Sequence, residues 1–159
     1  MLGAVGGAGL SGGIGFLNLL GFVPGMKDTP KEHFLYFWKA IDKYMRKRMP
    51  IFMLSTIAFV TGTIIMTVQQ AYRVPCWWMM GTLFFIVLDA IIAFSTNIPA
   101  NQFMQSLDAG KAKDSPEYSF FYDKAAKAFT MRGYCAIASF ACTIVGCYTQ
   151  FTQPVNSLY

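Results

Sequence analysis

The sequence is poor in charged residues, which argues against an ordinary soluble domain. Aspartate, glutamate, lysine and arginine make up 13% of its 159 residues, whereas a soluble domain carries about 25%. Hydrophobic residues make up 55%. The length suits a single domain, and the composition indicates lipid rather than water as the main solvent.

Metal-binding side chains are also scarce. The chain has one histidine, His33, and four cysteines without a CxxC spacing. A zinc site needs about four nitrogen, sulfur or oxygen ligands close together, so we expect neither a metal ion nor a cofactor. Cys76 and Cys147 should lie near the same membrane face, but sequence alone does not tell whether they pair. Loop orientation accounts for the net charge of +5, so we expect no nucleic-acid partner.

Long apolar stretches are what the sequence does have. About 20 apolar residues are enough to span a bilayer core. Four stretches meet this length, at residues 1–23, 49–68, 74–95 and 133–151, with polar connections at 24–48 and 101–132. We predict an all-α fold, an integral membrane four-helix bundle that forms one domain over residues 1–159. The short connection from Gln69 to Arg73 predicts an antiparallel hairpin.

Both polar connections contain helical signals. The first has apolar residues at helical spacing, namely Phe34, Phe37, Trp38, Ile41 and Met45. This spacing predicts an additional amphipathic helix between spans one and two, along the membrane surface or beneath the bundle, with Pro50 in the first turn of span two. In the second connection, Ser115-Pro116-Glu117 is typical of a helix start. We expect that helix to begin outside the bilayer and continue as span four.

Glycine is concentrated in the first apolar stretch. Gly3 with Gly7, and Gly9 with Gly13, form GxxxG pairs. In lipid, small residues at this spacing let two helix backbones approach closely. We therefore expect a helix that packs inside the bundle or against a partner; the alternative is a flexible N-terminus.

Lysine and arginine predict the orientation. The first polar connection carries seven, the second carries five, and both termini carry none. By the positive-inside rule the large connections should face the cytosol or the mitochondrial matrix. Both termini should then lie on the opposite side. A bacterial inner membrane and a mitochondrial inner membrane fit equally well.

Asp89 lies near the middle of the third apolar stretch. A carboxylate in hydrocarbon costs roughly 3 kcal/mol on insertion scales, so it should face the bundle interior. It could be a proton or ligand site. Alternatively it is a protonated acid bonded to a threonine of span two, with Thr56, Thr61 and Thr63 as candidates.

A second polar group surrounds the end of the third stretch. Pro99 should bend or end that helix, and Asn97 and Asn101 share a helix face. Arg132 enters span four at the same expected depth. Together with Asp89 these side chains form a candidate polar pocket for a ligand headgroup or an anion. Alternatively they cap a helix end beside a snorkelling arginine.

These features together resemble a known family. The glycine-rich first span, the long polar connection, Asn97-Ile98-Pro99-Ala100-Asn101 and the later Arg132 are similar to the anthrone oxygenase-like family of small four-helix membrane proteins, much of it of unknown function. The resemblance covers nearly the whole chain. It implies oxygenation of polycyclic anthrones to quinones near Asn97, Asn101 and Arg132, without a metal or flavin. Members commonly carry an Asn-His pair shortly before the arginine, where this chain has Phe129 and Thr130.

Three functional hypotheses follow. The first is a non-catalytic subunit of a larger membrane assembly, respiratory or otherwise energy-transducing, because no convincing catalytic constellation is evident and the first span has GxxxG faces. The second is a cofactor-independent oxygenase in which Arg132 stabilises an anionic phenolic substrate. The third is a carrier, or a lipid- or quinone-binding protein, that uses Asp89 and Arg132. The expected partners are the lipid bilayer, other membrane subunits and a bound lipid or quinone.

Overall fold

The computed structural model describes residues 2–69, 73–107 and 116–152. Within these ranges the chain forms helices and no strand. In chain order they are α1 (Leu2–Leu17), the π-helix η1 (Asn18–Phe22), α2 (Val23–Asp28), α3 (Lys31–Gln69), α4 (Arg73–Ile92), the π-helix η2 (Ala93–Asn97), α5 (Ile98–Ser106) and α6 (Pro116–Thr152).

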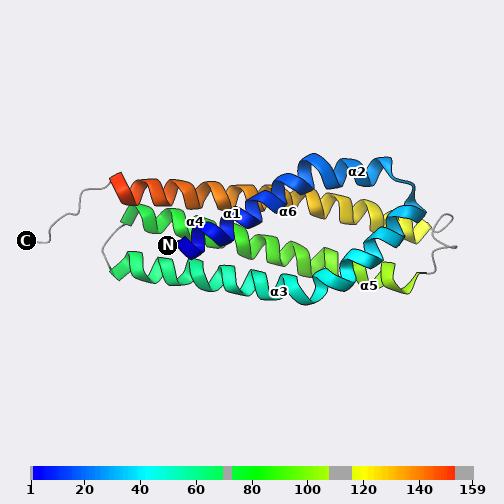
Figure 1. Ribbon diagram of the computed structural model, residues 1–159, viewed down its shortest axis with the longest axis horizontal. Coiled ribbons are helices and arrows are strands. Elements are labelled where there is room, and N and C mark those ends of the chain that lie inside the picture. Colours follow the sequence, from blue (N-terminus) through cyan, green and yellow to red (C-terminus); the bar gives the residue numbers. More distant parts are fainter. Residues whose placement is uncertain (1, 70–72, 108–115, 153–159) are drawn as a thin grey trace, which may run out of the picture.

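The helices join into long rods that lie side by side (Figure 1). α1, η1 and α2 follow one another without a break and form the first rod, and α4, η2 and α5 form the third. Together with α3 and α6, this gives four rods among the described residues, each long and apolar enough to cross a membrane. The prediction of an all-helical chain with four such helices is confirmed.

α6 holds the bundle together. It has its most extensive contacts with α4 and α1, and α3 closes the bundle by packing against α4 and α1. α4 and α6 meet at a buried polar contact, where the hydroxyls of Thr82 and Thr143 lie 3.1 Å apart. The predicted long helix is also confirmed, since α6 runs unbroken from Pro116 to Thr152. The expected cap Ser115 lies outside the described residues.

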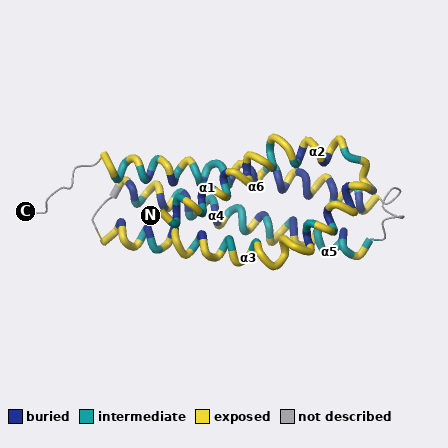
Figure 2. Tube along the Cα trace, in the orientation of Figure 1, coloured by how far each residue is buried: buried dark blue, intermediate teal, exposed yellow. Residues whose placement is uncertain are grey.

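The outer faces of the rods are exposed (Figure 2), and many of their side chains are large and apolar. Large hydrophobic side chains point away from the protein along their length, such as Leu54 on α3, Phe84 on α4 and Phe94 on η2. In a single helix bundle this leaves much apolar surface uncovered. Such a surface suits a surrounding lipid phase or further protein.

The amphipathic segment after the first rod is not a separate helix. Residues 31–48 belong to α3, which continues through Pro50 to Gln69. Proline removes one backbone hydrogen bond and kinks a helix without necessarily ending it, and α3 changes direction along its length (Figure 1). The prediction of an additional helix between spans one and two was therefore wrong.

The inner face of this segment also differs from the expected one. Its buried residues are Phe34, Leu35, Trp38 and Asp42, whereas Phe37 is exposed. The segment is turned so that a carboxylate lies inside. It packs against α2, α5 and α6 rather than along a flat surface.

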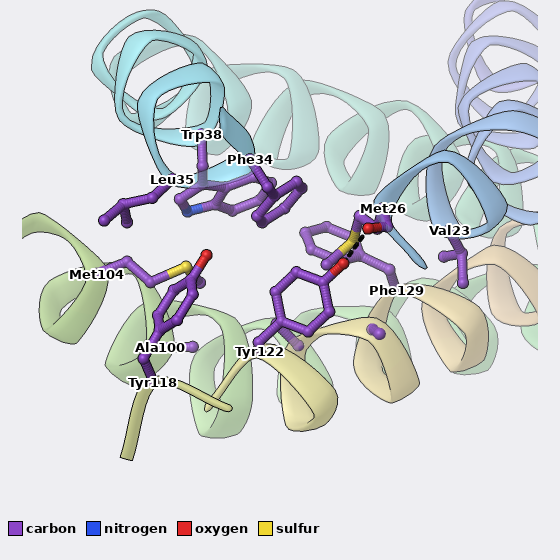
Figure 3. Close-up of a cluster of buried hydrophobic side chains, with 12 residues drawn as sticks. Val23, Met26, Phe34, Leu35, Trp38, Ala100, Met104, Tyr118, Tyr122 and Phe129 are labelled. Atoms are coloured by element: carbon purple, nitrogen blue, oxygen red, sulfur yellow. Dashed lines mark hydrogen bonds between the residues drawn. The ribbon is translucent and has the colours of Figure 1, made fainter. Parts of the chain in front are cut away.

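These contacts form a compact aromatic core at one end of the bundle, called here the polar-end core (Figure 3). Its buried members are Val23, Met26, Phe34, Leu35, Trp38, Ala100, Met104, Tyr118, Tyr122, Ala125, Ala126 and Phe129. The Tyr122 hydroxyl donates a hydrogen bond to the Met26 carbonyl. This bond ties the start of α6 to the end of α2.

Three of the four predicted packing glycines lie against neighbouring helices. An added Cβ at Gly3 would lie 2.6 Å from the Phe59 ring of α3, and Gly7 faces the same helix. Gly9 faces α6. Gly13 points away from the bundle: no described atom outside its own helix turn comes within 4 Å of an added Cβ.

The closest backbone approach involves glycines that the GxxxG pattern did not identify. An added Cβ at Gly15 would lie 2.8 Å from the carbonyl oxygen of Gly133 and 2.9 Å from the Ala136 Cβ. A backbone oxygen cannot rotate out of the way as a side chain can. α1 and α6 can therefore approach this closely only because both positions are glycine.

This contact yields a stability prediction. Gly15→Val should lower the free energy of unfolding by about 1–3 kcal/mol, because the new side chain overpacks the α1–α6 contact. Gly13→Val is the matched control, since it adds the same side chain to the same helix in open space. Unfolding in mixed micelles, followed by circular dichroism, measures both. Equal losses in the two variants would contradict the packing assigned to Gly15.

Candidate functional site

The structure divides the predicted polar pocket into separate sites. Asp89, Asn97 and Asn101 lie along the third rod, on α4, at the end of η2 and on α5. Asp89 and Asn101 are twelve positions apart in the sequence, or about 18 Å at 1.5 Å per residue. Arg132 on α6 reaches Asp89, whereas Asn101 bonds to α3. The four residues therefore do not converge on one pocket.

Asp89 and Arg132 form a two-point ion pair. The Arg132 Nε lies 2.7 Å from Asp89 Oδ1, and its Nη2 lies 3.3 Å from Oδ2. The two side chains are only 16% and 19% exposed. A planar guanidinium that donates twice to one carboxylate fixes the orientation of both groups.

The pairing overturns the alternative in which Asp89 bonds to a threonine of the second span. Thr56 and Thr63 donate to carbonyl oxygens of their own helix, and Thr61 is exposed. Two opposite charges brought together in an apolar region cost less than either charge alone. The pair thus explains how the carboxylate is accommodated.

A second polar network lies beside the polar-end core, and sequence reasoning missed its centre, Asp42. This residue is only 5% exposed. Its carboxylate accepts hydrogen bonds from Asn101 Nδ2 at 2.9 Å, Gln105 Nε2 at 3.2 Å and Arg46 at 2.7 Å. The Trp38 indole donates to Asn101 Oδ1 at 3.0 Å. Asn101 is therefore a bridge that holds α5 to α3.

A sequence signal for Asp42 existed. It lies four positions after Trp38 and eight after Phe34, on the buried side of α3. It also lies four positions before Arg46, a spacing that suits an ion pair on a helix. Asp42 lies in a polar connection rather than in an apolar stretch, so its charge does not stand out from that of its neighbours.

Asn97 is the exception among these polar groups. It is 5% exposed, and its Oδ1 has no hydrogen-bond partner among the described residues. A buried polar atom without a partner costs about 1–3 kcal/mol. A hydroxyl or amide donor brought to this oxygen would recover that free energy.

Asn97 also ends η2, one of the two π-helices among the described residues. π-helical turns are rare and frequently occur at functional sites. η1 ends at Phe22, whose ring lies 5.9 Å from Trp38 and 5.2 Å from Phe129. η2 ends at Asn97, directly before the helix that carries Asn101. Both irregular turns therefore lead into the polar-end core and its network.

The described residues line two open hollows that bear on the site, among others. One, of about 530 Å³, lies between the first rod and α6 and is lined in part by Leu20, Pro24 and Tyr134. The other, of about 320 Å³, lies beside Asp42. Neither is lined by Asp89, Asn97 or Arg132.

In the described part of the chain, neither the acidic nor the sulfur-containing residues assemble into a metal centre. Among the described residues, no group of three or more histidine, cysteine, aspartate or glutamate side chains could hold a metal ion. All four cysteines are free, so Cys76 and Cys147 do not pair in the structure.

Comparison with known proteins adds no relative. No protein-family model matches the chain, and no curated protein and no solved structure is significantly similar to it. The resemblance to the anthrone oxygenase-like family therefore stays a prediction. Function has to be argued from the geometry above.

The ion pair generates the second prediction. Asp89→Leu and Arg132→Leu should each lower the free energy of unfolding by about 3–5 kcal/mol, because each leaves an uncompensated buried charge. The double variant should lose less than either single one. Unfolding of all three and the wild type in the same micelles gives the coupling energy. Additive losses would mean that the two charges do not stabilise one another.

Proposed function

We propose that this chain is an integral membrane protein with four spans and acts as a non-catalytic subunit that packs within a larger membrane assembly. Four long apolar rods with uncovered outer faces support the membrane placement. An open surface on α1 supports the subunit role. The polar groups inside the bundle support a structural rather than a catalytic part.

Charge supports an orientation. α2, the start of α3, α5 and the start of α6 lie at the same end of the bundle (Figure 1). α2 and the starts of α3 and α6 carry most of the lysine and arginine residues, whereas α1 and α5 carry none. By the positive-inside rule this end faces the cytosol, or the matrix of a mitochondrion. A bacterial or mitochondrial inner membrane fits this arrangement.

The observation that carries the subunit role is an outward stripe on the first rod. It consists of exposed residues three or four positions apart, namely Leu2, Gly6, Leu10, Gly13, Leu17 and Leu20. Gly6 and Gly13 make no close contact with the described residues, since an added Cβ would meet nothing within 4 Å. In lipid, glycines between leucines allow a partner helix to approach closely.

The interior polar groups point the same way. Asp89 is neutralised by Arg132, and the Asp42 carboxylate accepts three hydrogen bonds. Groups engaged in this manner hold helices in register. They are not poised to attack or protonate a substrate.

The assembly role predicts the effect of filling the stripe. Gly6→Leu/Gly13→Leu should leave the fold intact, because both positions are open, but should release the chain from its complex. Gly25→Leu/Gly62→Leu is the matched control, since an added Cβ at these two glycines would also meet nothing within 4 Å. Native mass spectrometry after gentle extraction from the chain's own membrane measures the assembly. A lone wild-type protomer, or a double variant at Gly6 and Gly13 that stays assembled, would refute the subunit role.

One observation favours a second candidate, a cofactor-independent oxygenase of anthrone-like phenols. The unpartnered Asn97 Oδ1 could accept a hydrogen bond from a phenolic hydroxyl. As the family resemblance implies, Arg132 would stabilise the anionic form of such a substrate, which then reacts with oxygen. A membrane quinol would offer the same hydroxyl donor, which relates this candidate to a quinone-binding role.

This candidate has its own test. If it is correct, purified protein consumes oxygen with a model anthrone, and Asn97→Leu slows the rate roughly tenfold, as expected for loss of about 1.4 kcal/mol. Arg132→Ala should slow it at least as much. Gln102→Leu, an exposed amide on the same rod, is the control and should keep the wild-type rate. Equal rates in all four proteins would exclude the mechanism.

A further inference from the structure

The hollow beside Asp42 is strongly basic. It has a volume of about 320 Å³, and its lining residues are Lys39, Asp42, Lys43, Arg46, Lys47 and Gln105. Four of these side chains are cationic and one is a carboxylate. An opening this basic and this large attracts an anion.

The one carboxylate of the hollow is already engaged. Asp42 is 5% exposed and forms an ion pair with Arg46, and its oxygens also accept hydrogen bonds from Asn101 and Gln105. Lys39 donates to the Leu107 carbonyl. Lys43 and Lys47 are exposed, and no described carboxylate lies within ion-pair distance of either. Two ammonium groups therefore remain available at the mouth of the hollow.

The hollow lies where the polar part of α3 meets its apolar part. Lys43, Lys47, Ile51 and Leu54 follow one another at spacings of four, four and three residues, so they share one face of the helix. Ile51 and Leu54 are 69% and 67% exposed. Along this face, a cationic site is followed directly by an uncovered apolar surface. A phospholipid has the same arrangement, because its anionic phosphate is followed by apolar acyl chains.

We propose that this hollow binds the headgroup of an anionic phospholipid. Lys43 and Lys47 pair with the phosphate, and the acyl chains lie along Ile51 and Leu54. Basic pockets on the cytosolic or matrix side of helix bundles bind such headgroups. The inference rests on the proposed membrane placement and orientation. It does not depend on whether the chain is a subunit or an enzyme.

The test is native mass spectrometry of the full chain in neutral detergent, titrated with phosphatidic acid or with phosphatidylcholine. We expect one phosphatidic acid to be retained at concentrations where phosphatidylcholine is not. Lys43→Ala/Lys47→Ala should weaken retention at least about tenfold. Lys124→Ala/Lys127→Ala is the matched control, because it removes two exposed lysines from α6 at the same end of the bundle, and it should retain the lipid. Lys43→Arg/Lys47→Arg should also retain it.

Three outcomes would overturn the proposal. Equal retention of phosphatidylcholine would mean that the phosphate charge is not recognised. Equal losses of lipid retention in the two alanine double variants would mean that overall charge, rather than Lys43 and Lys47, determines binding. Displacement of the lipid by inorganic phosphate or glycerol 3-phosphate at similar concentrations would assign the hollow to a soluble anion. Release of the chain from membranes by alkaline carbonate would instead refute the membrane placement, which makes the two failures distinguishable.

Discussion

A polar group inside an apolar bundle has to find its partner within the protein, because a lipid phase supplies neither donors nor acceptors. This constraint accounts for most of the polar contacts along the rods. Thr56 and Thr63 bond back to their own helix, Thr82 bridges to α6, and Asp89 takes Arg132. Each bond that crosses between helices also fixes their register. The hydrogen bonds that satisfy these polar groups therefore also align the rods.

Features that depend on a single segment could be predicted from the sequence, whereas contacts that depend on how two segments pack could not. Apolar length alone predicts the four long helices, and the Pro116-Glu117 start predicts α6. The partner of Asp89 could not be predicted, because it is set by how far antiparallel α4 slides along α6. The contact between Thr82 and Thr143 and the ion pair share this register. A threonine on span two and an arginine on span four were equally compatible with the sequence.

Besides the register between helices, sequence spacing also does not determine how each helix is rotated about its own axis. The GxxxG pairs identified α1 as a packing helix, yet Gly13 faces outward while Gly15 makes the closest backbone approach. Likewise the segment 34–45 was recognised as amphipathic, but its inner side carries Asp42 rather than Phe37. Neighbouring helices decide which of several adequate faces turns inward. In α1 this leaves Gly6 and Gly13 exposed, and in α3 it places the buried carboxylate under the basic hollow.

Asn97 is a buried residue whose polar side chain does not match its surroundings. A leucine would fill a buried position there without a polar atom to satisfy, yet the chain has an amide whose oxygen lacks a described partner. The same residue ends a π-helical turn, so two departures from regular structure coincide at Asn97. Departures of this kind concentrate where a protein binds something or changes shape. Asp89 and Asn101, the other polar residues of the predicted pocket on this rod, already have hydrogen-bond partners. A donor that bonds to Asn97 would therefore leave the contacts that hold the rods together in place.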